Sequence, residues 1–217
     1  VVRHRIPAAQ AWARANAIDR VVVDGERRQL GIVTSGKAYV DVRQALAALG
    51  VDDARARALG VRVYKVGMIW PLEPSGLREF ARGHQELLFV EEKAAFVEDQ
   101  AAKILYHLGH DERPRLTGKH DDRGEALLPP DVQLDFAAVA LAIARRLTAL
   151  GLDDDALRGR VALLEGRLPH ARATPPGPAT RTPYFCSGCP HNTSTKVPEG
   201  SIALAGIGCH TMAGSMN

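Results

Sequence analysis

The feature that most constrains the fold is an alternation of short β-branched runs with helical segments over residues 20–110. Strand-like runs occur at 20–23, 30–34, 61–66 and 86–90. After the second run, a Ser-Gly turn leads into a segment in which Val42, Leu46 and Leu49 recur at helical spacing. Strands joined by helices form right-handed crossovers, which place the strands parallel in one sheet. The pattern therefore predicts a small α/β domain with a parallel sheet.

Three further helices are expected around these strands, at 8–17, at 71–80 after a turn, and at 95–108. The second half of the chain reads differently. Residues 110–130 are polar, charged and aperiodic, which is typical of a surface linker. The apolar segment 135–150, followed by 153–168 with three aspartates at its start, predicts a helical hairpin.

A Pro-rich segment at 169–183 cannot hold regular structure and marks a boundary. Together with the change in character after residue 110, it divides the chain into three parts. We expect an α/β domain, then a linker with the helical hairpin, then the opening of a further domain, at 1–110, 111–182 and 183–217 respectively.

Composition excludes several classes of protein. With 46% hydrophobic and 24% charged residues and a net charge of +3, the chain is not disordered as a whole. Its charges of both signs are interspersed, which argues against a nucleic-acid-binding face. The longest apolar stretch, 136–144, is too short to span a membrane, and no secretory signal is visible, so we expect a cytoplasmic protein. The missing initiator Met and the motif-dense end indicate a piece of a longer protein.

The three cysteines, Cys186, Cys189 and Cys209, all lie near the end of the chain. Their odd number and their clustering do not fit a disulfide scaffold. A Cys-x-x-Cys loop can direct two thiolates at one metal centre, and Cys209 could add a third ligand. A fourth would come from His191, from His210 or from beyond these residues. The spacing leaves an iron–sulfur site, a zinc site and no metal open, whereas a thioredoxin-type dithiol is disfavoured because a Pro-rich segment precedes the pair.

Three short segments elsewhere in the sequence were also considered as candidate sites. The Gly-Ile-Gly segment 206–208 follows an apolar run, so its backbone amides could face a ligand such as a phosphate. The Ser-Gly-Lys segment 35–37 is interpreted as a tight strand-to-helix turn with a solvated lysine. The Glu-Glu-Lys segment 91–93 is interpreted as a salt-bridged strand end or a subunit contact.

Two segments together, RTPYFCSGCPHN at 181–192 and GIGCH at 206–210, resemble the indolepyruvate ferredoxin oxidoreductases. Three upstream segments resemble the same family: LGIVTSGKAY at 30–39, YKVGMIWPLEP at 64–74 and VEEK at 90–93. The resemblance thus covers nearly the whole chain. It places the chain among the 2-oxoacid:ferredoxin oxidoreductases, which act on an oxo group with an iron–sulfur acceptor.

The resemblance implies a reaction for the parent protein. In such enzymes thiamine diphosphate attacks the keto carbon of the 2-oxoacid, CO2 leaves, and coenzyme A takes the acyl group. Electrons pass through iron–sulfur clusters to ferredoxin. The implied cofactors of the parent are thiamine diphosphate, Mg²⁺ and a [4Fe–4S] cluster, and we expect this fragment alone to bind them weakly, partially or not at all. The implied partners are ferredoxin, coenzyme A and an arylpyruvate such as indolepyruvate, and we expect a homodimer without nucleic acid or membrane.

The resemblance also assigns parts of this chain. Residues 20–110 are similar to the transketolase C-terminal-like domain, which is mostly architectural, and residues from 183 on resemble the opening of the thiamine-diphosphate-binding domain. Cluster ligands are implied at Cys186, Cys189 and Cys209. Contact with the cofactor is implied at Ile207, Gly208, Cys209 and His210.

The chain departs from the family pattern in three ways. The interval between Cys189 and Cys209 is shorter than in many relatives, and Pro190-His191 stands where a Gly is common. No Gly-Asp-Gly segment for magnesium and diphosphate occurs. We therefore expect no catalytic residue in this fragment and no turnover by it alone. The alternative from the residues is a non-catalytic assembly module in which zinc is held by the three cysteines and one of His191 or His210.

Overall fold

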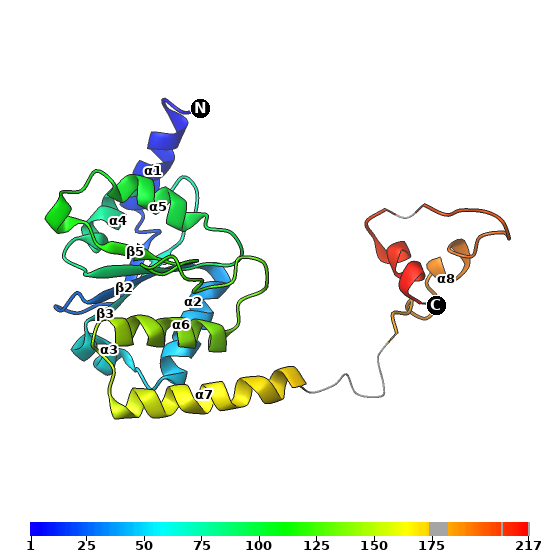
Figure 1. The fold of residues 1–217 in the computed structure, drawn as a ribbon. Coiled ribbons are helices and arrows are strands. Elements are labelled where there is room, and N and C mark those ends of the chain that lie inside the picture. The colour runs from blue at the N-terminus through cyan, green and yellow to red at the C-terminus, as the bar shows by residue number, and fades with distance from the viewer. Residues whose placement is uncertain (174–181, 205, 217) are drawn as a thin grey trace. The chain divides into compact units, whose positions relative to one another are not determined.

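The computed structural model describes residues 1–173, 182–204 and 206–216, with side chains omitted for 167–173 (Figure 1). It divides into two compact units, Val1–Pro169 and His170–Asn217. We call them the sheet unit and the cysteine unit. Much of the Pro-rich segment predicted as a boundary lies outside the described residues, and the predicted domain limits at 110 and 182 stay predictions. In the described part of the chain, no helix has the length and apolar character needed to cross a membrane.

The sheet unit is built on a five-stranded sheet with the strand order β1-β3-β2-β4-β5. Strands β3, β2, β4 and β5 run parallel to one another, whereas β1 is antiparallel to β3. The bounds are β1 Arg20–Val23, β2 Leu30–Ser35, β3 Val61–Val66, β4 Glu86–Val90 and β5 Arg115–Thr117. The predicted α/β class is confirmed, and the predicted parallel pairing holds for β3, β2, β4 and β5.

The sheet differs from the prediction at both edges. Strand β1 lies antiparallel at the β3 edge, where a single neighbour satisfies its ladder and neither direction is forced by a crossover. Strand β5 lies inside the segment 110–130 that was predicted as a linker. With three residues it is too short to show periodicity, and its position depends on pairing with β4.

Helices cover both faces of this sheet (Figure 1). Those of the sheet unit are α1 Arg5–Ala15, α2 Gly36–Ala48, α3 Asp53–Leu59, α4 Pro74–Ala81, α5 Val97–Leu105 and α6 Phe136–Ala149, with a 3₁₀ turn η1 at His110–Glu112; α7, Asp155–Ala173, begins in this unit. Helices α2, α3 and α6 lie on one face, and α4 and α5 lie on the other. Helix α3 was not predicted, although Asp52 caps its start and Gly60, at φ +79°, ends it.

The alternation of side chains along the strands produces two separate cores. In β2, Leu30 and Ile32 face α2 and α6, whereas Val33 faces α4 and α5. In β4, Leu88 faces α2 and α6, and Phe89 faces α4 and α5. Each central strand is buried on both faces, which explains why these runs are continuously apolar rather than alternating.

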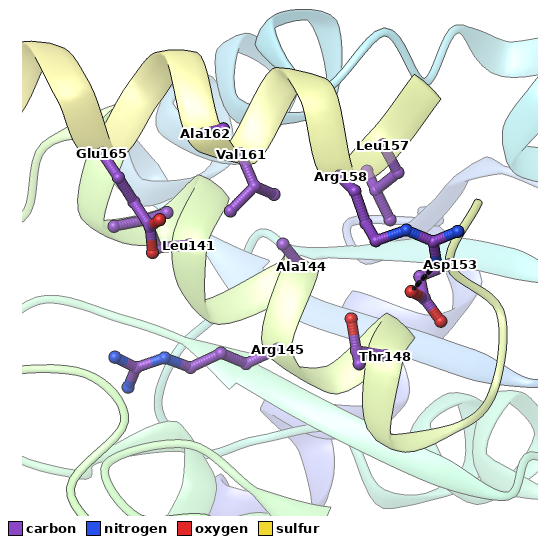
Figure 2. Close-up of a pocket in the computed structure, with 10 residues that line it drawn as sticks. All are labelled: Leu141, Ala144, Arg145, Thr148, Asp153, Leu157, Arg158, Val161, Ala162 and Glu165. Atoms are coloured by element: carbon purple, nitrogen blue, oxygen red, sulfur yellow. Dashed lines mark hydrogen bonds and ion pairs between the residues drawn. The ribbon is translucent and has the colours of Figure 1, made fainter. Parts of the chain in front are cut away.

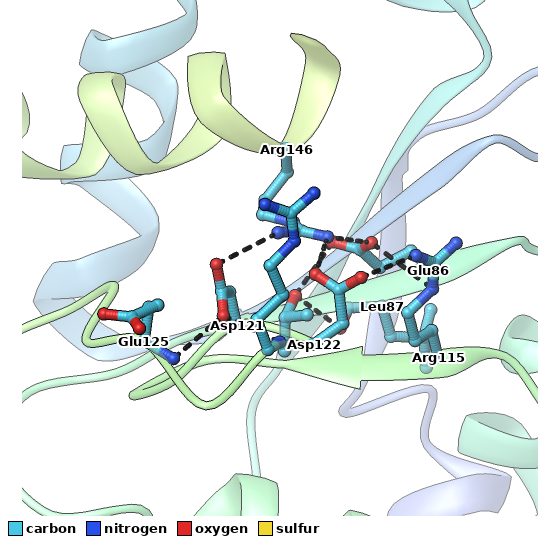
Figure 3. A network of polar contacts seen from close by, with 9 residues as sticks. Glu86, Leu87, Arg115, Asp121, Asp122, Glu125 and Arg146 are labelled. Carbon is cyan, nitrogen blue, oxygen red and sulfur yellow. Dashed lines mark hydrogen bonds and ion pairs between the residues drawn. The ribbon is translucent and has the colours of Figure 1, made fainter. Parts of the chain in front are cut away.

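Helix α6 is joined to the sheet by a buried polar network (Figure 3). Arg146 of α6 donates from Nε and Nη2 to the two carboxylate oxygens of Glu86, at 2.6 and 2.7 Å. Both side chains are buried. Thr117 of β5 donates to Glu86 at 2.9 Å, and Asp122 pairs with Arg146 at 2.8 Å. The hydrogen bonds from Arg115 and Arg146 lower the pKa of Asp122 to about 2. The network therefore fastens α6 and the segment after β5 to the amino end of β4.

Candidate functional site: the cysteine turns

The Cys-x-x-Cys sequence forms a tight turn in the cysteine unit. The backbone N–H of Cys189 donates to the carbonyl of Cys186 at 3.0 Å. Gly188 sits at φ +77°, a conformation that favours glycine. Asn192 also donates from its side chain to the Cys186 carbonyl, at 3.1 Å. The turn leads into the short helix α8, His191–Ser194, and so presents both cysteines at one end of that helix.

His191 lies directly against the second cysteine. Its Nδ1 is 3.2 Å from the Sγ of Cys189. The His191 ring stacks on Phe185, with centroids 5.4 Å apart, and on His210, with centroids 6.0 Å apart. Phe185 is buried. The stack therefore holds the imidazole in place and brings the turn that contains His210 beside the Cys-x-x-Cys turn.

The second turn is shaped by His210, which lies in the 3₁₀ helix η2, Cys209–Ser215. The N–H of Gly206 donates to Nε2 of His210 at 3.0 Å. A Cβ on Gly208 would lie 2.9 Å from Cε1 of His210, so a larger residue there would displace the ring. Ile207 between the glycines is fully exposed. Ile207, Gly208, Cys209 and His210 thus form a single turn, and their contact with a cofactor stays a prediction.

The thiols have the chemistry that an iron–sulfur or zinc centre requires. All three are free; Cys186 and Cys209 are exposed, and Cys189 is half-buried. Within residues 1–173, 182–204 and 206–216, however, no three His, Cys, Asp or Glu side chains converge as a metal site. The structure places Cys186 and Cys189 in one turn but does not gather Cys209 with them. The donor pair fits a thiolate-bound centre, and ligation by all three stays a prediction.

The Ser-Gly-Lys segment is a structural turn at the carboxyl end of β2. Gly36 has φ +52° and starts α2. As predicted, Lys37 is exposed to solvent, and its ammonium also donates three hydrogen bonds: to Asp41 at 2.7 Å, to Glu92 at 3.0 Å and to the carbonyl of Leu134 at 2.6 Å. Its pKa is raised by the hydrogen bonds to Asp41 and Glu92. Lys37 thus ties α2 to the end of β4 and to the segment before α6.

The Glu-Glu-Lys segment also has a structural role. The buried Glu91 carboxylate accepts from the N–H groups of Val97 and Glu98, at 2.8 and 3.0 Å, at the start of α5. The Glu91 carbonyl accepts from Nζ of the buried Lys119 at 2.6 Å. Burial lowers the pKa of Lys119. Sequence reasoning missed Lys119 because it follows β5, a strand with no pattern of its own.

A pocket of about 330 Å³ lies between α6 and α7 (Figure 2). Leu141, Ala144 and Val161 form part of its apolar wall, and Arg158 pairs with Asp153 at one end. No Cys or His lines this pocket. The predicted chemistry therefore does not lie here.

Two solved structures are similar to parts of the chain. One, described as a split gene transketolase, inactive beta4 tetramer, aligns with a TM-score of 0.40 and 23% identity over 59% of this chain and 41% of its own. The other is a 2-oxoglutarate:ferredoxin oxidoreductase from Magnetococcus marinus, with a TM-score of 0.41 and 13% identity over 66% of this chain and 23% of its own.

Sequence relatives agree on one name, indolepyruvate oxidoreductase subunit IorA. The protein of Thermococcus kodakarensis is 28% identical over 86% of this chain and 26% of its own length. That of Methanothermobacter marburgensis is 25% identical over 92% of this chain and 29% of its own. The chain thus spans about a quarter of the length of these relatives. Residues 20–170 match the family model of the indolepyruvate oxidoreductase domain. Because this match covers most of the chain, the chain belongs to the indolepyruvate oxidoreductase domain family.

Proposed function

We propose that the chain is part of an oxidoreductase that oxidatively decarboxylates arylpyruvates such as indolepyruvate to acyl-CoA and passes the electrons through iron–sulfur clusters to ferredoxin. The match of residues 20–170 to the indolepyruvate oxidoreductase domain carries this proposal. The names of the IorA relatives support it. Coenzyme A and ferredoxin are the proposed partners, and the protein is proposed to work as a homodimer.

The two units take different parts in this function. The sheet unit is proposed as the architectural domain, because the side chains of Lys37 and Glu91 form hydrogen bonds within the fold. The cysteine unit is proposed to hold the cofactors. Its assigned ligands to a [4Fe–4S] cluster are Cys186, Cys189 and Cys209, and its assigned contacts to Mg²⁺-bound thiamine diphosphate are Ile207, Gly208, Cys209 and His210. Exposure of Cys186, Cys209 and Ile207 supports this assignment, since a cofactor can reach them.

When bound, thiamine diphosphate supplies the nucleophilic carbon and the electron sink for decarboxylation. The chain's own turn at 206–210 would orient it through backbone amides. The chain lacks a Gly-Asp-Gly segment for the metal and diphosphate. We therefore propose that the 217 residues do not turn over substrate without the rest of the active site.

A zinc-stabilised assembly module is the second candidate. The observation that favours it is the pairing of Cys189 with His191 and the stacking of His191 on His210, which bring imidazoles beside a thiol. Zinc accepts such mixed sulfur and nitrogen ligands, whereas iron–sulfur clusters use thiolates predominantly. In this candidate His191 or His210 completes a site with the three cysteines.

The metal content of cysteine variants tests both candidates. The full parent protein is reconstituted anaerobically with iron and sulfide, and iron, acid-labile sulfide and zinc are measured in wild type, Cys186→Ser, Cys189→Ser and Cys209→Ser. Ser187→Ala, an exposed change in the same turn, is the matched control. We expect each cysteine variant to lose about one cluster's worth of iron and sulfide, and the control to keep it. Loss of zinc with iron unchanged would instead favour the assembly module.

Catalysis is tested separately on the intact enzyme. We expect indolepyruvate and coenzyme A together to drive ferredoxin reduction, and the three cysteine variants to abolish it. Undiminished electron transfer in all three variants would contradict the assigned cluster ligands. Absence of indolepyruvate-dependent reduction in the wild-type enzyme would contradict the substrate assignment.

A further inference from the structure

The pocket between α6 and α7 has no part in the reaction proposed above, yet it has the size and the lining of a small-molecule site. Its volume of about 330 Å³ lies within the range of ligand clefts, about 300–1,000 Å³. Its wall is aliphatic, formed by Leu141 and Ala144 of α6 and by Leu157, Val161 and Ala162 of α7 (Figure 2). No aromatic side chain is among the described residues that line it. The wall therefore fits an alkyl chain and offers no ring for an aryl group to stack on.

The polar groups beside this wall differ in whether they are paired. Arg158 pairs with Asp153 and Asp155, so its charge is balanced within the protein. Arg145 and Thr148 of α6 also line the pocket. Among the residues whose side chains the structure describes, neither the Arg145 guanidinium nor the Thr148 hydroxyl has a hydrogen-bond or ion-pair partner. The pocket thus combines an aliphatic wall with one unpaired cation and one hydroxyl.

These unpaired groups indicate the kind of ligand. A guanidinium donates two parallel hydrogen bonds to a carboxylate, and Thr148, three residues after Arg145 on the same helix face, can donate a further one. Glu165 of α7 lines the pocket as well, and its negative charge opposes a second negative charge on the ligand. A ligand with a single carboxylate therefore fits this pocket better than a phosphate ester does.

We propose that the pocket between α6 and α7 binds an aliphatic monocarboxylate. Its carboxylate pairs with Arg145 and Thr148, and its alkyl chain lies against the wall that Leu141 and Val161 help to form. The proposal is independent of the oxidoreductase assignment, because no cysteine and no residue of the turn at 206–210 takes part in it. Failure of either one leaves the other standing.

Three variants test the two halves of this site. Arg145→Ala removes the cation from an exposed position of α6. Ala162→Leu fills the pocket from an exposed position of α7. Arg160→Ala removes an exposed arginine of α7 that does not line the pocket, and is the matched control for a general loss of positive charge.

The measurement is isothermal titration calorimetry of the full parent protein with octanoate, hexanoate and octan-1-ol. We expect one octanoate to bind per chain, and hexanoate to bind more weakly, by up to about fourfold for each methylene removed. Octan-1-ol and the Arg145→Ala variant should each weaken binding about tenfold, because a hydrogen-bonded charge pair is lost. Ala162→Leu should abolish octanoate binding, and Arg160→Ala should match wild type.

Other results overturn the proposal. Absence of octanoate binding to the wild type refutes it outright. Equal affinities for octanoate and octan-1-ol, or an equal loss in Arg145→Ala and Arg160→Ala, refute the role of Arg145. Unchanged binding in Ala162→Leu places the acid elsewhere on the protein. If Ala162→Leu does not fold, as circular dichroism would show, Arg145→Ala and the comparison of octanoate with hexanoate still decide the question.

Discussion

The sheet unit and the cysteine unit hold their shape by different means. In the sheet unit, central strands such as β2 and β4 are buried on both faces, and charges such as Glu86 and Lys119 lie inside with partners. Among the described residues of the cysteine unit, Phe185 alone is buried, and large apolar side chains such as Ile202 and Ile207 are exposed. The comparison shows that burial determines the first unit, whereas local turns and ring stacking around a few reactive side chains determine the second.

The largest expected effect lies in the sheet unit's buried network. Arg146→Ala leaves the fully buried Glu86 carboxylate without its two shortest hydrogen bonds, both from a charged donor. Breaking one partner of such a pair costs about 3–5 kcal/mol of unfolding free energy. Urea denaturation measures the change. The neighbouring, exposed Arg145→Ala is the control, and a similar loss in both variants would show that helix α6 rather than the ion pair is responsible.

A pair of isoleucines tests the contrast between the units directly. Ile143→Ala empties space in the core between α6 and the sheet and should cost about 2–5 kcal/mol of unfolding free energy. Ile207→Ala removes a fully exposed side chain, so its effect should stay within about 0.5 kcal/mol. Chemical denaturation of both variants, followed by far-ultraviolet circular dichroism, gives the comparison. Equal losses would mean that Ile207 is buried in solution.

A pH dependence is expected from His84 in the sheet unit. Burial, with help from the Arg62 charge, lowers the pKa of His84 to about 4 from 6.5. Between these values the unfolded chain binds a proton that the folded chain does not. Stability from this residue is thus fully present above about pH 6.5 and falls by about 3 kcal/mol as the pH drops to about 4.

His84→Phe, which keeps a ring against Phe80, removes this dependence. Unfolding free energies of wild type and variant are compared between pH 7 and pH 4. Relative to the variant, the wild type should lose about 3 kcal/mol of unfolding free energy as the pH falls from 7 to 4. Parallel curves over this range would show that His84 titrates alike in the folded and unfolded states.

The smallest expected effect is at the start of α6. Asp135 accepts a hydrogen bond from the Ala138 N–H at 2.7 Å, so Asp135→Ala should cost about 1 kcal/mol of unfolding free energy. Thermal unfolding measures the shift. Asp131→Ala, an exposed aspartate in the preceding segment, should change stability by a few tenths of a kcal/mol. A larger loss of stability in Asp131→Ala than in Asp135→Ala would show that Asp135 does not cap helix α6.

Much of the sheet unit could be predicted because its signals are local. The strands 20–23, 61–66 and 86–90 have the predicted bounds, since each is a β-branched or apolar run closed by a turn. Helix α6 lies within the predicted helical segment 135–150, because its apolar period is a local signal, and Asp135 caps its start. The antiparallel direction of β1 and the existence of β5 could not be predicted, because each depends on a neighbouring strand far away in sequence.

In the cysteine unit, the sequence indicated the reactive residues but not the contacts between them. The residue types at 186–192 and 206–210 were sufficient to indicate thiol chemistry and the family, since both follow from side-chain identity at short spacing. That His191 lies on Cys189 and stacks on His210 could not be read from spacing, because it requires two turns to meet.

By itself, the sequence determined the α/β class, the bounds of strands β1, β3 and β4, the reactive residues and the resemblance to the family, because these depend on local pattern and chemical identity. Only the tertiary structure decided which partners Lys37 and Glu91 bind, that Glu86 and Arg146 are paired inside the sheet unit, and that an imidazole lies against one thiol. These facts depend on distances between residues remote in sequence, which packing sets and local pattern does not encode.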